Sequence, residues 1–157
     1  MDSASLRQAF SLFATGITVV TTRNEQGAAC GVTINSFSSL SLDPPMVLFC
    51  LNKESSLLRL IKNNGFFGVN VLNSEQAHLS ERFAFSEKTS EMGDISFIES
   101  EKKLPVFLES LVAFECHVSG LHDGGDHRII LGEVEKFHIG QGDPLLYFRS
   151  HYARLEP

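Results

Sequence analysis

The feature that most constrains the fold is a repeated alternation of short β-type runs with turn sequences. Residues 17–22 (Ile-Thr-Val-Val-Thr-Thr) are dense in β-branched side chains, which favour strands. Residues 24–27 (Asn-Glu-Gln-Gly) are typical of a hairpin turn, and a second strand is expected from about residue 28 into the segment at 33. Residues 46–51 are continuously apolar, which indicates a strand buried on both faces or paired inside a barrel.

The second half of the chain repeats this pattern. Residues 66–72 predict a strand with Phe67, Val69 and Val71 on one face, and the alternation from residue 111 to 118 predicts a half-exposed strand. A tight turn is expected within 121–127 around Gly124-Gly125, then a long strand over 128–139, a turn at 140–144, a last strand at 145–148 and a polar tail. The polar segment 86–103 predicts a surface excursion with a short strand near 95–98.

Three helices are expected beside these strands. Leu6, Ala9, Phe10 and Phe13 have helical spacing, so an amphipathic helix is predicted to run up to Gly16. A second helix is predicted from an N-cap at residue 55 to the Asn-Asn-Gly sequence at 63–65. For the third, Ser74 is the predicted cap, Glu75 suits the positive helix end, and the helix runs to about residue 83.

Six or more strands with short turns and two or three helices predict a small antiparallel barrel, a mainly β fold with peripheral helices. The alternation of strand and helix is too irregular for a doubly wound parallel sheet. A chain of 157 residues has the length of a single domain, taken here as 1–157. Neither G-x-G-x-x-G nor G-x-x-x-x-G-K-[ST] occurs, so no standard dinucleotide or P-loop site is predicted.

Composition excludes several classes of function. The formal net charge of −6 argues against a general affinity for nucleic acid phosphates. No window holds the roughly eighteen consecutive apolar residues of a membrane helix, and the N-terminus lacks the order of a signal peptide. The three cysteines are scattered and form no C-x-x-C pair, so neither a disulfide framework nor a zinc site is predicted. We therefore expect a cytoplasmic protein.

The stretch 33–45 (Thr-Ile-Asn-Ser-Phe-Ser-Ser-Leu-Ser-Leu-Asp-Pro-Pro) concentrates hydroxyl and amide groups in one place. Such a run suits an uncharged polar ligand that needs many hydrogen bonds. Ser and Asn are also ordinary turn residues, and composition alone favours a Ser-rich loop between two strands. The two prolines end the run, because proline cannot donate to a sheet ladder.

Several phrases match one family in the same order along the chain. They are Phe-Ala-Thr-Gly-Ile-Thr-Val-Val-Thr-Thr at 13–22, Gly-Val-Thr-Ile-Asn-Ser-Phe-Ser-Ser at 31–39, Leu-Asp-Pro-Pro at 42–45, Phe-Cys-Leu at 49–51, His-Asp-Gly-Gly-Asp-His at 122–127 and Pro-Leu-Leu-Tyr-Phe-Arg at 144–149. Over about residues 6–152 the chain resembles the flavin reductase family, the small reductase components of two-component flavin monooxygenases.

The resemblance implies a six-stranded antiparallel split β-barrel with Greek-key topology, and a homodimer. It implies oxidation of NADH or NADPH with reduction of FMN or FAD, and diffusion of the reduced flavin to a separate oxygenase. We lean to NADH, because no basic cluster for a 2′-phosphate is visible near the Gly124-Gly125 turn. The alternative is a flavin-binding module, a carrier or sensor, without reductase turnover.

The family pattern also implies a set of site residues. His127 is the candidate for a direct role, as a group that positions the nicotinamide or acts on it electrostatically. The candidate flavin contacts are Thr33, Asn35, Ser36, Ser38, Ser39, Cys50, Leu51, Asn52, Ser55, Ser56, Arg82, Phe83, Gly125 and Tyr147. Arg149, His151 and Tyr152 join Tyr147 in a C-terminal polar cluster, where Ser150-His151 departs from the family pattern for contacts with the nicotinamide nucleotide.

Two features of this set have a physical basis in the residues themselves. Ser55 and Ser56 open the predicted second helix close to Lys53, and a helix N-terminus with a nearby cation favours phosphate. A plain N-cap would have the same geometry. The segment 122–127 holds two His and two Asp residues, but the sequence places no third ligand group near it, so no metal site is predicted.

Overall fold

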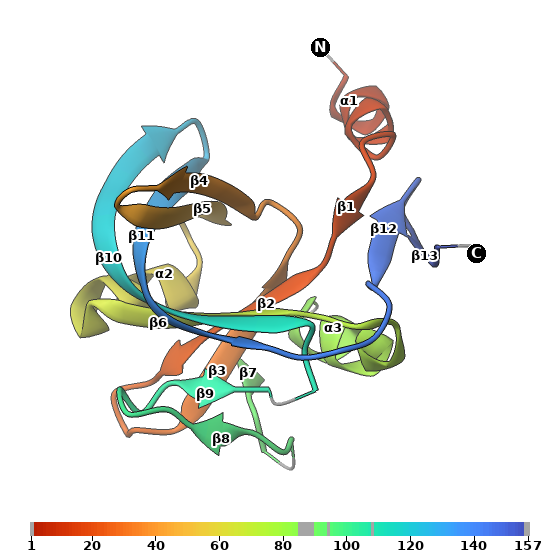
Figure 1. Cartoon of the computed structure of the whole chain (residues 1–157). Coiled ribbons are helices and arrows are strands. Elements are labelled where there is room, and N and C mark those ends of the chain that lie inside the picture. Colours follow the sequence, from red (N-terminus) through yellow and green to blue (C-terminus); the bar gives the residue numbers. More distant parts are fainter. Residues whose placement is uncertain (1, 85–89, 94, 108, 156–157) are drawn as a thin grey trace.

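In a computed structural model, which describes residues 2–84, 90–93, 95–107 and 109–155, the chain is mainly β-structure (Figure 1). One antiparallel sheet runs in the order β4-β5-β11-β10-β6-β2-β3-β7. Its six long strands are β2 (Thr18–Arg23), β3 (Ala29–Ile34), β5 (Pro45–Asn52), β6 (Phe66–Val71), β10 (Val112–Gly124) and β11 (His127–Ile139). Shorter strands, β4 (Ser38–Leu42) and β7 (Ser90–Glu91), lie at its edges. The predicted mainly β class is confirmed, with eight described strands in this sheet instead of six.

Strong curvature of β10 and β11 closes this sheet into a barrel. Both strands bend through a wide arc that joins the layer of β6, β2 and β3 to the layer of β5 and β4 (Figure 1). Register shifts between Glu115 and Cys116 and between Val118 and Gly120 accompany the bend, as β-bulges increase local twist. The hairpin that joins the two strands turns at Gly125, whose φ of 68° is the conformation glycine adopts most readily.

The barrel interior is a continuous apolar core. Phe49 of β5 and Phe67 of β6 are fully buried and meet edge to face, with ring centroids 5.1 Å apart. Helix α2 (Ser56–Asn64) closes this core with Leu57, Leu60 and Ile61, and ends at Gly65 as predicted. In β5 only alternate residues are buried, so this strand is paired inside the barrel and is not buried on both faces.

A second core lies under the helix that follows β6. The prediction of Ser74 as its cap is wrong: the N-cap is Asn73, whose side chain accepts from the backbone N–H of Glu75, while the Gln76 side chain accepts from the backbone N–H of Asn73. This reciprocal capping box begins a 3-10 turn, η1 (Ser74–Gln76), which continues into α3 (Ala77–Ala84). Phe83 of α3 stacks on Phe107 in this core.

The two ends of the chain meet in a small separate sheet of β1 (Thr15–Gly16), β12 (Leu146–Phe148) and β13 (His151–Ala153). The helix α1 (Ser3–Phe10) stops well before Gly16, where it was predicted to end, and none of its residues is buried. The predicted polar tail instead forms β13, because Arg149 and Ser150 adopt positive φ values of 51° and 63° in a tight hairpin.

Three further differences concern local boundaries. The Ser-rich stretch is not one loop, since its second half forms β4 against β5. The half-exposed strand predicted over 111–118 continues to Gly124, so the hairpin turn is shorter than expected. Within the excursion 86–103, of which residues 86–89 and 94 lie outside the described part, the short strand is β8 (Ile98–Glu99), paired with β9 (Pro105–Val106).

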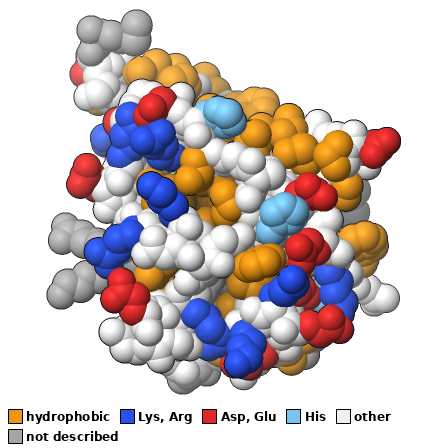
Figure 2. All heavy atoms as spheres, turned by 90° about the vertical axis from the view of Figure 1, so that its left-hand side faces the viewer, with side chains coloured by type: hydrophobic (Ala, Val, Ile, Leu, Met, Phe, Trp, Pro, Cys, Tyr) orange, Lys and Arg blue, Asp and Glu red, His pale blue; other side chains and the backbone are white. Residues whose placement is uncertain are grey.

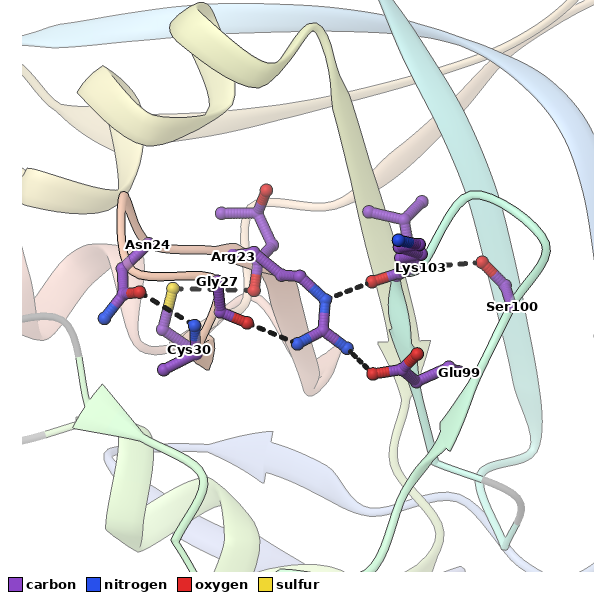
Figure 3. A network of polar contacts seen from close by, with 10 residues as sticks. Arg23, Asn24, Gly27, Cys30, Glu99, Ser100 and Lys103 are labelled. Atoms are coloured by element: carbon purple, nitrogen blue, oxygen red, sulfur yellow. Dashed lines mark hydrogen bonds and ion pairs between the residues drawn. The ribbon is translucent and has the colours of Figure 1, made fainter.

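Arg23, at the end of β2, fastens this excursion to the barrel (Figure 3). Its guanidinium donates to the backbone carbonyls of Lys103 and Gly27 and forms an ion pair with Glu99. No helix in the described part of the chain is long and apolar enough to cross a membrane.

Candidate functional site

A small pocket lies where β3, α3 and the β12–β13 hairpin meet. It measures about 200 Å³ and is lined by Ile17, Thr33, Ile34, Asn35, Ser80, Ala84, Tyr147 and Tyr152. The Thr33 hydroxyl donates to the Ser80 carbonyl at 2.7 Å, and the Tyr152 hydroxyl donates to the Ser80 side chain at 2.9 Å. Whole-ligand sites usually measure roughly 300–1,000 Å³, so this pocket suits one part of a larger ligand, such as one ring.

Ser36 joins the segment after β3 to strand β5. Its hydroxyl donates to the Cys50 carbonyl at 3.1 Å and accepts from the Cys50 backbone N–H at 3.0 Å. The side chain of Ser36 therefore takes the place of one rung that would continue the β4–β5 ladder beyond the Ser38–Leu48 pair. Ser38 and Ser39 follow on β4, where they are exposed.

His127 lies beside the C-terminal end of β5, close to Cys50, where β11 leaves the β10–β11 hairpin. It pairs with Asn52 across the β5–β11 ladder, so the hairpin and the entry to α2 are adjacent. Its Nδ1 lies 2.7 Å from Asp126 Oδ1, and this interaction with His127 lowers the pKa of the Asp126 carboxyl. The described residues offer no partner to Nε2, which leaves that nitrogen for a ligand. Gly125 precedes Asp126 at the tip of the hairpin.

Beside this hairpin, along α2, runs a groove of about 530 Å³ that we call the basic groove. Its lining residues are Lys53, Ser55, Leu58, Arg59, Lys62, Leu121 and Arg128. Two of its cations share one carboxylate: Lys53 Nζ lies 2.8 Å from Asp123 Oδ1, and Arg128 NH1 lies 3.1 Å from Asp123 Oδ2. The hydrogen bond from Lys53, followed by the charges of Arg128 and Lys53, lowers the pKa of Asp123.

The N-terminus of α2 opens toward this groove. Ser55 occupies the N-cap position, but its side chain makes no capping hydrogen bond, which leaves the hydroxyl available. The backbone N–H of Lys53 donates to the Asp126 carbonyl, so the loop before α2 is fixed against the hairpin. A helix N-terminus with cations beside it is a suitable environment for a phosphate group. The donors of the groove therefore fit the phosphate of a flavin nucleotide.

The structure thus brings most of the predicted site residues to two places along one band of the barrel. The small pocket is lined by Thr33, Asn35 and Tyr147. The β10–β11 hairpin and the start of α2 hold the second group, which consists of Asn52, Ser55, Ser56, Gly125 and His127. Ser36 and Cys50 lie between them on the β3–β4 connection and β5. The Cys50 thiol is partly buried, and this burial raises its pKa.

Three predicted residues do not join this band through their side chains. Leu51 and Phe83 are buried in the two cores. On α3, Ser80 and Ala84 share the face that lines the small pocket, whereas Arg82 donates to the Met92 carbonyl and lines another cavity on a different face. A role of Leu51 or Phe83 toward a ligand is limited to the backbone.

The sequence did not single out several lining residues. Ser80 is a hydroxyl within a helix, and no sequence signal distinguishes it. Arg59 and Lys62 have the i, i+3 spacing of one helix face, but their proximity to the Gly124-Gly125 hairpin follows only from the fold. The stated reason for preferring NADH, the lack of a basic cluster near this hairpin, is therefore wrong. Among the described residues, no group of three or more His, Cys, Asp or Glu could hold a metal ion.

An antiparallel barrel that carries a ring-sized pocket of mixed apolar and polar lining and a groove lined by cations suits a protein that binds a nucleotide cofactor. Residues 10–156 match the model of the flavin reductase like domain, and the chain belongs to this family. The resemblance drawn from the sequence motifs is confirmed.

Similar proteins carry names that agree with this family. One is the reductase subunit HsaB of a flavin-dependent monooxygenase of Rhodococcus jostii, 37% identical over 158 residues that cover 100% of this chain and 80% of the relative. Another is the FMN reductase (NADH) SmoA of Agrobacterium fabrum, 38% identical over 98% of this chain and 87% of the relative. The structure of the NADH:FAD oxidoreductase SgcE6 of Streptomyces globisporus superposes with a TM-score of 0.92 at 31% identity, covering 99% of this chain and 95% of that one. These relatives confirm the predicted enzyme class, an NAD(P)H-dependent flavin reductase.

Proposed function

We propose that this chain is an NAD(P)H:flavin oxidoreductase that reduces FMN or FAD and releases the reduced flavin to a separate monooxygenase. The observation that carries this proposal is the family match over residues 10–156. The small pocket and the basic groove, which together hold or adjoin most of the motif residues, support it. We further propose that residues 1–157 act as one domain.

The bound cofactors supply the chemistry of hydride transfer from nicotinamide to flavin. The protein binds and orients them. In our proposal, Thr33, Asn35 and Tyr147 hold one ring in the small pocket, and Ser55 and Ser56 at the start of α2 hold the flavin phosphate with Lys53. Ring alignment at contact distance accounts for most of the catalytic effect, so no acid–base pair is required.

His127 has the direct role in this scheme. Its hydrogen bond to Asp126 fixes the imidazole through Nδ1 and leaves Nε2 directed away from that carboxylate. A nicotinamide carboxamide can accept from or donate to this nitrogen, depending on the tautomer. We assign His127 to positioning the nicotinamide nucleotide.

The decisive experiment is anaerobic mixing of the purified protein with NADH and either FMN or FAD while flavin absorbance is followed. Bleaching well above the protein-free rate supports the reductase, and the faster flavin identifies the preferred substrate. Flavin binding without bleaching, with NADPH also tried, would support the alternative, a flavin carrier or sensor.

Two parts of the proposal concern partners. A separate oxygenase is proposed because similar proteins are named reductase subunits of monooxygenases. A homodimer is proposed because large apolar side chains stay exposed on α1, β4 and the end of β11. We propose the cytoplasm as the location.

A further inference from the structure

The basic groove extends well beyond the N-terminus of α2. Ser55, Arg59 and Lys62 line it together because they lie on one face of the helix. Ser55 and Lys62 are seven positions apart, which corresponds to about 10 Å along the helix axis. A groove of this length has room for anionic groups at more than one point.

The charges of the groove are distributed over this whole length. Four of the thirteen Lys and Arg residues of an otherwise acidic chain line it. Lys53 and Arg128, near the hairpin, are partly neutralised by Asp123. Arg59 and Lys62 make no ion pair or hydrogen bond within the described residues, so their charges are available to a ligand. Figure 2 shows groups of Lys and Arg side chains on the side of the molecule that carries β10 and α2.

The groove also has an apolar floor. Leu58 of α2 and Leu121 of β10 both line it, and both are partly buried against the barrel core. A planar aromatic base can lie on such a floor while a guanidinium stacks on its other face. A ligand with phosphates and an aromatic base matches this combination better than a phosphate alone.

We propose that the basic groove binds the adenosine diphosphate half of FAD, with Arg59 and Lys62 on its phosphates, and that FAD is therefore preferred over FMN. This inference rests on the proposed function, because it assumes that the flavin phosphate enters at the start of α2. FMN ends at its single phosphate, so it meets Ser55 and Lys53 but does not reach the second half of the groove.

The test measures binding without turnover. FAD and FMN are titrated separately into the purified protein without NADH, and flavin fluorescence gives each dissociation constant. The variants are Arg59→Ala, Lys62→Ala and the double variant. Lys136→Ala is the matched control: it removes an exposed lysine of β11 eight residues beyond Arg128, about 26 Å along the strand. Thermal melting confirms that each variant is folded.

We expect each single variant to weaken FAD binding about fivefold, the effect of one lost charged contact, and FMN binding less than about twofold. Lys136→Ala should change neither, and free ADP should displace FAD from the native protein but not from the double variant. Added salt should reduce the preference for FAD.

Other outcomes overturn the inference. Equal losses for FMN and FAD would show a site for a single phosphate only. Unchanged dissociation constants for both flavins, together with a raised KM for NADH or NADPH in separate steady-state kinetics, would assign the groove to the nicotinamide nucleotide. The titration needs no hydride transfer, so the two proposals can fail separately. If the variants weaken FAD binding as predicted but the native protein does not bleach flavin with NADH or NADPH, the groove assignment stands and the proposed reductase activity is excluded.

Discussion

At the scale of single residues, the hydroxyl of Ser36 is the most informative group, because the fold and the proposed site both use its segment. It replaces a ladder rung by bonding both backbone groups of Cys50. We expect Ser36→Ala to lower the free energy of unfolding by about 1–3 kcal/mol, since a partly buried N–H and carbonyl lose their partner. Chemical denaturation measures this change.

Ser39→Ala is the matched control for Ser36. Ser39 belongs to the same Ser-rich stretch, but it is exposed and its side chain makes no described hydrogen bond. Its free energy of unfolding should stay within about 0.5 kcal/mol of the native value. Equal effects of the two substitutions would contradict the structural role of Ser36.

His127→Ala should lower kcat/KM for NADH about tenfold while leaving the dissociation constant for flavin within about twofold, because the imidazole is assigned to the nicotinamide alone. Steady-state kinetics and a flavin titration measure the two quantities. His122→Ala, in the same hairpin, is the control and should leave both values close to native. Unchanged kinetics of the His127 variant with NADH would exclude the assignment.

The cysteines give a prediction about pH. Burial, with smaller effects from Glu135 and Glu115, raises the pKa of Cys116 to about 12, and burial also raises the pKa of Cys50. A raised pKa means less thiolate at a given pH, so alkylation of the folded protein at pH 8 should be slow at Cys50 and absent at Cys116. Mass spectrometry of iodoacetamide-treated protein measures this, and the rate at Cys50 should increase with pH. Rapid labelling of Cys116 without unfolding would contradict its burial.

At the scale of secondary-structure elements, Arg23 determines how the β8–β9 excursion stays on the barrel. Its guanidinium contacts two segments: the β8–β9 hairpin through Lys103 and Glu99, and the β2–β3 turn through Gly27. Arg23→Ala should destabilise the protein by about 1–2 kcal/mol and speed hydrogen exchange of β8 and β9, while the barrel strands keep their protection. Arg154→Ala, which removes an exposed Arg with one long ion pair to Glu75, is the control. Uniform loss of protection would show that Arg23 supports the whole barrel.

Elements were predictable wherever local sequence dominates. Strands β2, β5 and β6 follow from β-branched or apolar runs, and α2 ends at Gly65 as its sequence indicates. Prediction failed where an alternative side-chain contact decided the outcome, as when Asn73 displaced Ser74 as the cap of η1. Prediction also failed at β13, because Arg and Ser rarely adopt a positive φ, and the turn before β13 depends on Arg149 and Ser150 doing so.

At the scale of the whole molecule, the candidate site was predictable only in part. The motifs located Thr33, Asn35 and His127, because those phrases are short and continuous. The basic groove joins residues from position 53 to position 128, and only the packing of α2 against the β10–β11 hairpin brings them together. A sequence pattern cannot specify such a surface without the fold.

The apolar side chains exposed on the surface of the molecule predict that the chain forms a homodimer. Leu42 is 95% exposed, Ile139 77% and Phe137 58%, although side chains of this size are usually buried. Phe137 continues a row of aromatic rings through Phe114 to Phe37, so this exposed apolar surface is continuous with the barrel core. Covering it with a second copy would remove apolar area from water without any change in the fold.

Light scattering should therefore find a dimer for the native chain at micromolar concentration and a monomer for the Phe137→Glu/Ile139→Glu variant, because two charges cannot be buried unpaired in an apolar interface. Leu155→Glu, at a residue that is 61% exposed near the C-terminal end, is the control and should remain dimeric. A native chain that is monomeric at this concentration would exclude the homodimer. A variant that stays dimeric would place the interface elsewhere, and the exposed residues of α1 would then be substituted next.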